Sequence, residues 1–155
     1  MITVEEAFKL VQNNITPNEK TISIELNNSL GYVLASSVFS PINMPPFRQS
    51  AMDGYALNLH DKSNYKIIDK VKAGDEHQPI LYKGEAVRIF TGSAVPETAN
   101  TVIMQEKVTV KENHLLINNS VSENKNIRPL GEQIKKGTLA LKKGTKLTPA
   151  AIGFL

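Results

Sequence analysis

The stretch NMPPFRQSAMDGYAL, residues 43–57, places two prolines shortly before an Asp-Gly pair. Pro45 and Pro46 fix their own φ angles, and Pro46 also biases the residue before it toward extended backbone. Asp53 and Gly54 follow, and such a pair is typical of tight hairpin turns. The segment therefore predicts a rigid bend in which Asp53 has a fixed position.

Two interpretations of this bend are open from the residues alone. In the first, Asp53 and Gly54 only form a type I′ turn. In the second, the bend presents the Asp53 carboxylate together with the hydroxyls of Ser50 and Tyr55. A carboxylate held in this way could bind Mg²⁺ through water or orient a polar substrate group.

The composition is that of a globular protein. The chain has 155 residues, 41% apolar and 21% charged, which suits one domain or two small ones. It has no cysteine, which excludes disulfides and thiolate metal sites. The start MITVEEAF is not a signal peptide, and no run approaches the roughly 18 apolar residues of a membrane helix. We therefore expect a cytoplasmic protein with no membrane contact.

The positive charge is concentrated toward the end of the sequence. The net charge is +3, and residues 107–155 hold nine Lys and Arg against three Asp and Glu. A basic end of this kind either attracts phosphates and other anions or is a solvated surface. Binding to nucleic acid is not expected, because these lysines lack interleaved aromatic residues and no known recognition module is present.

Most of the remaining pattern predicts β structure. Short runs that alternate or are rich in β-branched residues, bounded by turn residues, are typical of strands. Such runs occupy residues 21–26, 65–71, 85–90, 101–110 and 113–119. Residues 111–113 are expected to form the tip of a hairpin between the last two. Short strands with regular turns favour a small barrel or sandwich.

Helices are predicted only near the two ends of the sequence. Thr3 and Glu6 have the spacing of a capping box, and apolar residues follow at helical intervals. Thr148 and Pro149 are a typical N-cap and first helical residue. The sequence stops at Leu155, soon after this helix begins, and we interpret this as an end near a domain boundary.

Two further segments have a simple local prediction. Residues 29–38, SLGYVLASSV, are expected to form a turn or short helix that leads into a strand. The sequence Lys-Lys-Gly-Thr occurs at 135–138 and again at 142–145, which predicts two tight turns on either side of the short strand TLAL.

The segment RIFTGSAVP, residues 88–96, ends a predicted strand with a turn at Thr91, Gly92 and Ser93. Consecutive backbone N–H groups in such a turn can bind an anion, with the two hydroxyls beside them. The alternative is an ordinary loop between strands. The spacing fits neither a Walker loop nor a dinucleotide-binding fingerprint.

The remaining candidates are single residues. Arg128 precedes Pro129 in a stiff segment, where its guanidinium either binds a planar anion or has a structural role, paired with Glu132 or a carbonyl. The histidines are far apart in sequence and lack the spacing of a zinc site; they are His60, His77 and His114.

Three segments in this order resemble one family. They are PPFRQSAMDGYAL (45–57), RIFTGSAVPETANTVIMQE (88–106) and NIRPLGEQIKKGTLALKKGTKLTPAAIGFL (126–155). They resemble the N-terminal region of MoeA, a molybdopterin molybdenumtransferase that is related to the E domains of gephyrin and of plant Cnx proteins. The resemblance covers essentially the whole chain, and SAMDGYA is its most specific part.

The resemblance implies an α+β fold. An elongated mixed domain would comprise residues 1–54 and 125–155, with a β-rich, barrel-like domain inserted at 55–124. MoeA proteins are homodimers of four-domain chains, and their pterin-binding domain would follow Leu155. The cleft of such proteins is completed by that domain and by the partner subunit, so we expect the isolated chain to be inactive.

The resemblance also implies a reaction. MoeA-like proteins insert molybdate into adenylylated molybdopterin, release AMP and require a divalent cation, usually Mg²⁺. The adenylylated substrate comes from a MogA-type adenylyltransferase, which would be the pathway partner. A different reading is that this part of the protein is a structural dimerisation or scaffold module without catalysis.

Individual residues match the family motifs. Asp53 and Thr91 match positions tied to activity and are the expected catalytic residues, with Asp53 also a possible metal ligand. The expected substrate-binding residues are Ser50, Gly92, Ser93 and Arg128.

Three positions depart from the common family pattern, which has aspartate at each. They are Arg48, Asn100 and Gln133. If any of these aspartates holds the cation in relatives, this chain lacks that ligand.

Overall fold

The computed structural model describes residues 2–16 and 20–155. The chain divides into two compact units. One comprises the described residues of Met1–Ser37 together with Leu141–Leu155, and the other comprises Val38–Ala140. Helices and strands are segregated along the chain, and the expected α+β class is confirmed. The expected domain bounds, with an insertion at 55–124, remain a prediction.

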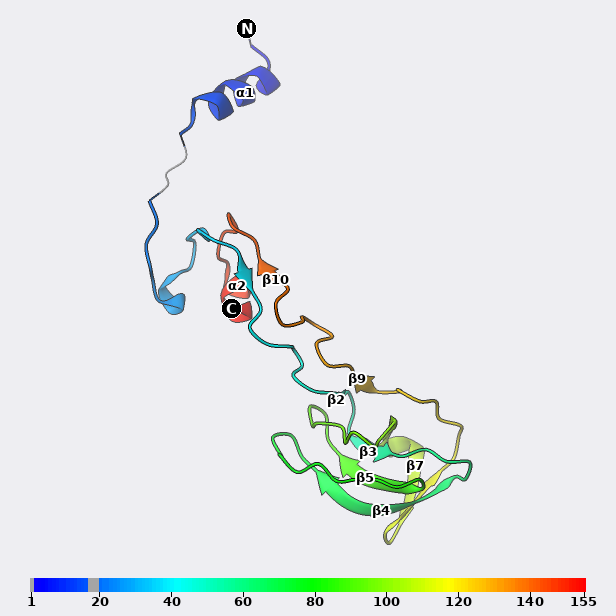
Figure 1. Ribbon diagram of the computed structural model, residues 1–155. Helices are drawn as coiled ribbons and strands as arrows, with labels where there is room; N and C mark the ends of the chain where they lie inside the picture. The colour runs from blue at the N-terminus through cyan, green and yellow to red at the C-terminus, as the bar shows by residue number, and fades with distance from the viewer. Residues whose placement is uncertain (1, 17–19) are drawn as a thin grey trace. The chain divides into compact units, whose positions relative to one another are not determined.

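A curved six-stranded sheet dominates the second unit (Figure 1). Only β4 and β5 run parallel, and the other neighbouring strands are antiparallel. In spatial order the strands are β6 (Thr101–Met104), β3 (Gly54–Leu57), β5 (Glu85–Ile89), β4 (Asn64–Val71), β8 (His114–Ile117) and β7 (Val108–Lys111).

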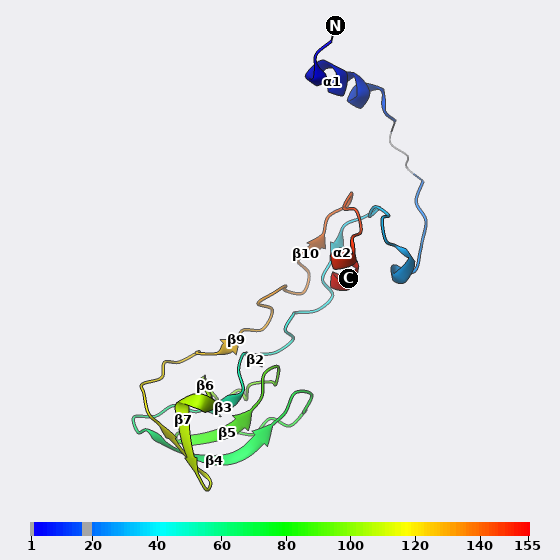
Figure 2. The same cartoon turned by 180° about the vertical axis from the view of Figure 1, so that it is seen from behind.

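Both faces of this sheet are covered. Successive residues of a strand point to opposite faces, and in β3 both Ala56 and Leu57 are completely buried. Ala56 belongs to one apolar cluster with Val87 and Val102, and Leu57 belongs to another with Ala86 and Ile103. Because β-branched and apolar residues occupy consecutive positions here, the central strands have two packed faces rather than one. Figure 2 shows the same sheet from behind.

The strands expected at 65–71, 85–90 and 113–119 are confirmed as β4, β5 and β8. The hairpin tip is also confirmed, with Glu112 at a φ of 53° between β7 and β8. The single strand expected at 101–110 is wrong. A 3₁₀ turn, η2 (Gln105–Lys107), divides it, because β6 pairs with β3 whereas β7 pairs with β8 at the other edge of the sheet.

The strand expected at residues 21–26 is also wrong. The segment is irregular and ends in the 3₁₀ turn η1 (Leu26–Asn28). Alternation by itself does not make a strand, because the backbone groups need a neighbouring strand and none of the described residues pairs with this segment. Ile22 is 66% exposed, so its apolar side chain also lacks a covering layer.

The helix predictions are confirmed. α1 (Val4–Asn14) begins with a complete capping box, in which Thr3 N–H donates to Glu6 Oε2 at 2.8 Å and Glu6 N–H donates to Thr3 Oγ1 at 3.1 Å. α2 (Pro149–Phe154) begins at Thr148, whose Oγ1 accepts from the N–H of Ala151 at 3.2 Å. No helix among the described residues is long and apolar enough to cross a membrane.

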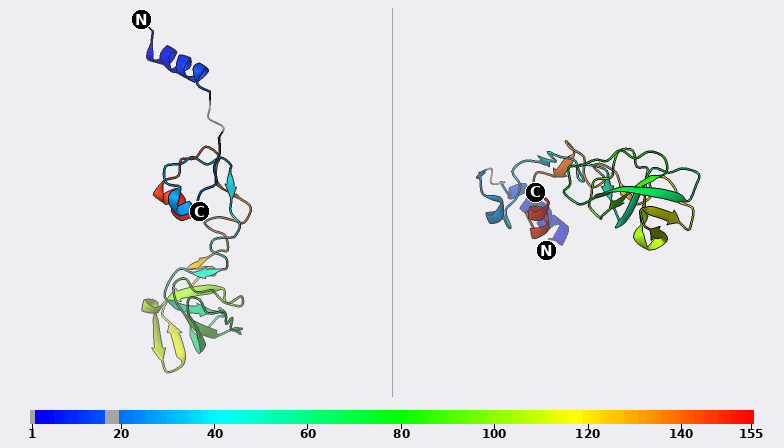
Figure 3. Two further views of the ribbon diagram at one scale, coloured as in Figure 1. Left: turned by 90° about the vertical axis from the view of Figure 1, so that its left-hand side faces the viewer. Right: turned by 90° about the horizontal axis from the view of Figure 1, so that it is seen from below.

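Two arms of the second unit lead into the sheet and run antiparallel to each other (Figure 3). They pair through a bridge between Met44 and Ile134, and through β2 (Gln49–Ser50) with β9 (Ile127–Arg128). Another two-stranded sheet joins β1 (Val38–Phe39) to β10 (Leu139–Leu141). This pairing brings the segments around residues 50 and 128 together although they are far apart in sequence.

The local turn predictions are confirmed. The segment 29–38 forms a turn and then reaches β1. The two Lys-Lys-Gly-Thr repeats are turns on either side of β10, with Gly137 and Gly144 at φ values of 81° and 86°. Glycine suits these positions because other residues rarely adopt a left-handed backbone.

The start of β3 provides a stability test. A Cβ added at Gly54 would lie 1.8 Å from the carbonyl oxygen of Ile103, so we expect Gly54→Ala to lower the free energy of unfolding by at least about 2 kcal/mol. Gly153→Ala is the control, because a Cβ there meets nothing within 4 Å. Chemical denaturation of both variants measures the effect, and equal stability of the two would contradict the proposed crowding.

Candidate functional site

Asp53 and Gly54 do not form a hairpin turn. The strands on either side of them have different partners, since β2 pairs with β9 and β3 pairs with β5 and β6. Gly54 is the first residue of β3 and is not among the glycines with positive φ, whereas a type I′ turn needs positive φ at both central residues. The first interpretation of the bend is therefore wrong, and glycine is required by the nearby backbone of β6.

The register of the sheet brings Asp53 close to Thr91. Gly54 lies opposite Ile89 in the antiparallel pair of β3 and β5. The residue before β3 and the residues after β5 therefore meet at the same edge of the sheet. Two segments separated by 38 positions in sequence become neighbours in this way.

The Asp53 carboxylate is bonded twice to Thr91. Its Oδ1 accepts from the backbone N–H of Thr91 at 2.7 Å and from Thr91 Oγ1 at 2.8 Å. These two bonds, with the positive charge of Arg88 as a smaller contribution, lower the pKa of Asp53 below its ordinary value. Both side chains are exposed, so the site presents an ionised carboxylate with a fixed orientation at the surface.

The turn at Thr91, Gly92 and Ser93 does not present free N–H groups to an anion. The Thr91 N–H donates to Asp53, that of Gly92 donates to Ser50 O at 3.0 Å, and that of Ser93 donates to Phe90 O at 3.0 Å. Each N–H already has an acceptor within the chain, so the anion-binding turn is not observed in this conformation. The turn instead fixes the position of Thr91.

Two buried serines, Ser93 in this turn and Ser50 bonded to it, have their side chains away from solvent. Ser50 is 1% exposed, its N–H donates to Ser93 O at 2.9 Å, and its hydroxyl donates to Met52 O at 2.7 Å. Ser93 is fully buried, and its hydroxyl has no hydrogen-bond partner among the described atoms. The backbone of Ser50 therefore holds the turn through its bonds to Gly92 and Ser93, and direct contact with substrate remains a prediction for both serines.

Arg128 lies on β9 opposite Gln49 of β2. The side-chain amide of Gln49 donates to Gly92 O at 3.2 Å, so Arg128 is one strand away from the Thr91 turn. The arginine is exposed, and the described residues contain no ion pair between it and Glu132. The geometry leaves its guanidinium available for an anion, which remains a prediction.

Two of the three departures from the family pattern have structural partners. Arg48 donates to the carbonyls of Glu97 at 3.2 Å and Ala99 at 2.7 Å. Asn100 accepts from Leu59 N–H at 3.0 Å. Both side chains thus tie loops together within this unit.

The amide of Asn100 also donates to Glu123 at 3.2 Å, which an aspartate could not do. Gln133 is exposed, and its backbone N–H donates to Met44 O at 2.9 Å.

No group of three or more acidic, histidine or cysteine side chains suited to a metal ion occurs in the described parts of the chain.

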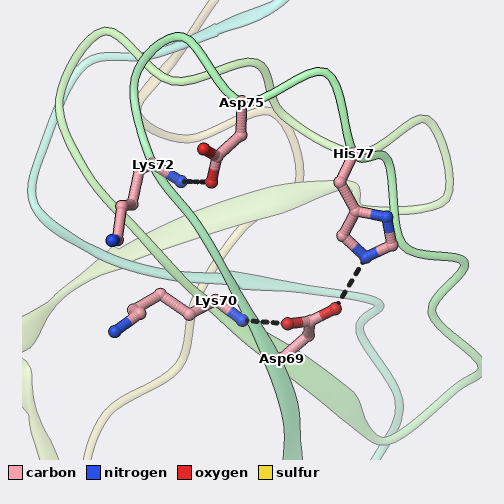
Figure 4. Close-up of polar contacts among 5 residues, drawn as sticks. All are labelled: Asp69, Lys70, Lys72, Asp75 and His77. Atoms are coloured by element: carbon pink, nitrogen blue, oxygen red, sulfur yellow. Dashed lines mark hydrogen bonds and ion pairs between the residues drawn. The ribbon is translucent and has the colours of Figure 1, made fainter.

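A second carboxylate, that of Asp69 on β4, is held by a similar set of bonds, which attach the loop after β4 to the strand (Figure 4). Asp69 accepts from the N–H of Lys70 and from His77 Nε2, each at 2.7 Å, and these bonds lower the pKa of Asp69. Asp75 closes the adjacent turn by accepting from the N–H of Lys72 at 2.7 Å. His77 therefore pairs with a carboxylate in a 64% exposed setting, where an ion pair contributes little stability.

A groove of about 950 Å³ also lies in this unit, but neither Asp53 nor Thr91 lines it. Its walls include the apolar side chains of Phe47, Ile80 and Leu130. The hydrogen-bonded pair of Asp53 and Thr91, called the bonded pair below, is therefore separate from the groove.

The sequence analysis missed Arg88 and Gln105. The Arg88 guanidinium donates to Gly54 O at 3.0 Å and to Gln105 Oε1, and it lies over the rings of Tyr55 and Phe90. An arginine two positions before an aromatic residue in a strand was the available signal, because alternate residues share a face. The contact of Arg88 with the Tyr55 ring could not be predicted in this way, because it depends on the pairing of β3 with β5.

The bond from the Thr91 hydroxyl can be tested by titration. We expect Thr91→Val to raise the pKa of Asp53 partway toward its ordinary value, since the backbone N–H bond stays. In the unsubstituted chain the bond persists at neutral pH and is lost only as the pH falls through the lowered pKa of Asp53. Carboxyl ¹³C NMR measures this, with Thr109→Val on β7 as the control. An unchanged Asp53 titration would show that the hydroxyl does not stabilise the carboxylate.

Known proteins that are similar to this chain in sequence and in structure have molybdopterin in their names. The molybdopterin molybdenumtransferase of Haemophilus influenzae is 35% identical to this chain, in a match that covers 100% of this chain and 39% of the relative. The molybdopterin molybdenumtransferase of Staphylococcus epidermidis is 32% identical, in a match that covers 99% of this chain and 38% of the relative. The crystal structure of the molybdopterin biosynthesis MoeA protein from Pyrococcus horikoshii OT3 superposes with a TM-score of 0.88 and 33% identity, covering 97% of this chain and 42% of that one. The chain thus spans about two fifths of the length of these relatives. Residues 2–155 match the MoeA N-terminal region (domain I and II), and the chain belongs to that family.

Proposed function

We propose that the longer protein containing this region is a molybdopterin molybdenumtransferase, which inserts molybdate into adenylylated molybdopterin and releases AMP. Relatives that match essentially the whole chain carry that name, which supports a role in molybdenum cofactor biosynthesis. The observation on this chain that carries the proposal is the bonded pair of Asp53 and Thr91 at the edge of the sheet.

Asp53 and Thr91 would act by placement rather than as nucleophiles. The carboxylate is ionised and its Oδ1 is already occupied by Thr91, while Oδ2 has no hydrogen bond to the described residues. An oxygen that is free and held in one direction can orient a polar group or a hydrated cation without reorganisation during the reaction. Arg128 would hold an anionic group of the substrate.

Mg²⁺ fits this donor set only in part. Mg²⁺ needs six oxygen ligands and usually keeps several waters, with one or two carboxylates and substrate phosphates. Asp53 can provide one carboxylate oxygen, and the described residues provide no acidic cluster around it. When bound, the cation would neutralise negative charge on the phosphate groups, and most of its ligands would come from water and substrate.

The complete site would need more than this chain. We propose that the other part of the longer protein and a second subunit complete the cleft, so that residues 1–155 alone have no activity. A MogA-type adenylyltransferase would supply the adenylylated substrate. The position of the bonded pair at an open surface is compatible with this arrangement.

A structural dimerisation or scaffold role is the second candidate, and one observation favours it. None of the described residues of α1 is buried, although the helix has an apolar face that includes Val4, Phe8 and Val11. Phe8 alone is 66% exposed, and such a face is normally covered by another surface. Self-association without binding of adenylylated molybdopterin would favour this candidate.

The transferase proposal is tested in the longer protein by Asp53→Ala. We expect molybdate insertion to fall by at least about 100-fold, the scale of losing one preorganised electrostatic contact, with little loss of stability because Asp53 is exposed. Asp61→Ala, which removes an exposed carboxylate from a different loop, is the control and should keep the normal rate. Insertion at the normal rate in Asp53→Ala would reject the assignment.

A further inference from the structure

We propose that Arg88 is a positioning residue that holds Asp53 and Thr91 together by contacting the chain on both sides of the pair; its importance for a reaction rests on the proposed function. Arg88 is on β5, two residues before Phe90 and three before Thr91. It lies opposite Tyr55 of β3 in the antiparallel register. One side chain can therefore reach both segments that carry the pair.

On the Asp53 side, Arg88 contacts the backbone directly. Its Nη1 donates to the carbonyl of Gly54, the residue after Asp53, at 3.0 Å. Its Nη2 donates to Gln105 Oε1, and the N–H of Gln105 donates to Asp53 O at 3.2 Å. The peptide groups around Asp53 are thus held directly at one point and through Gln105 at another.

On the Thr91 side, Arg88 contacts an aromatic ring. Its guanidinium carbon lies 4.8 Å from the ring centroid of Phe90, the residue before Thr91, and 5.2 Å from that of Tyr55. A planar guanidinium can stack on rings and donate in its plane at the same time, whereas a lysine ammonium cannot. The arginine therefore links the Phe90–Thr91 segment to the start of β3.

The positive charge of Arg88 is a separate contribution. Arg88 is the smallest of the influences that lower the pKa of Asp53, and both bonds from Thr91 rank above it. If the charge were the main role, lysine would replace arginine without loss. If positioning is the main role, lysine should preserve the charge and still loosen the pair.

The test compares Arg88→Lys and Arg88→Met with the unsubstituted 155-residue chain, without substrate. We expect amide hydrogen exchange at Thr91 to accelerate about tenfold in both variants, the scale of a lost hydrogen bond and cation–π contact. The Asp53 titration, followed by carboxyl ¹³C NMR, should shift upward more in Arg88→Met than in Arg88→Lys. Exchange at Val87, in the middle of β5, should not change, which separates local loosening from general destabilisation.

Arg48→Lys is the matched control. Arg48 is also partly buried and also makes two hydrogen bonds, but its acceptors are the backbone carbonyls of Glu97 and Ala99. It should leave the exchange of Thr91 and the titration of Asp53 unchanged. If Arg88→Met fails to fold, Arg88→Lys decides the question by itself.

Thr91 exchange equal to that of the unsubstituted chain in a folded Arg88→Lys variant would overturn the proposal. An activity measurement in the longer protein adds a separate test, in which Arg88→Lys should lower kcat more than it changes KM. If the protein proves not to be a molybdenumtransferase, the exchange and titration results still decide whether Arg88 positions the pair. The failure of one hypothesis is therefore distinguishable from the failure of the other.

Discussion

The close approach of Gly54 to the backbone of Ile103 is the constraint on which this part of the structure depends. A side chain at position 54 would collide with the carbonyl oxygen of Ile103. Without that approach β3 could not lie between β5 and β6 in its present register, and the register is what sets Asp53 beside the end of β5. The glycine of the Asp-Gly pair therefore serves sheet packing rather than a turn.

The candidate site results mainly from the antiparallel pairing of β3 with β5. An antiparallel pair places the start of one strand next to the end of the other, and here those ends carry Asp53 and Thr91. The backbone of Ser50, which bonds to Gly92 and Ser93, and the side chain of Arg88, which bonds to Gly54, hold the backbone in that arrangement. The backbone N–H donors within the turn are already used, and the exposed polar groups in this part of the structure are the Asp53 carboxylate and the side chains of Thr91 and Arg128.

Two of the residues that depart from the family pattern, Arg48 and Asn100, hold loops around the sheet in place. Arg48 and Asn100 bond to backbone groups of neighbouring loops, so the residues found at these two positions have structural contacts of their own. Asn100 illustrates the reason most clearly, because its amide can donate to Glu123 where a second carboxylate would repel it. The bonds of Asp53 to Thr91 do not involve either residue.

The features that local chemistry controls could be predicted from the sequence alone. The capping box at Thr3, the turns at Gly137 and Gly144, and the helix start at Thr148 are set by side chains and φ preferences within a few residues. The resemblance to the family also predicted Asp53 and Thr91, each from its own motif, as catalytic residues. Tertiary structure decided what depends on pairing between distant segments. It left 21–26 without a partner, divided 101–110 between two edges of the sheet, and brought Arg88 to Asp53. These outcomes depend on which strands become neighbours, and alternation along a sequence carries no information about the neighbour.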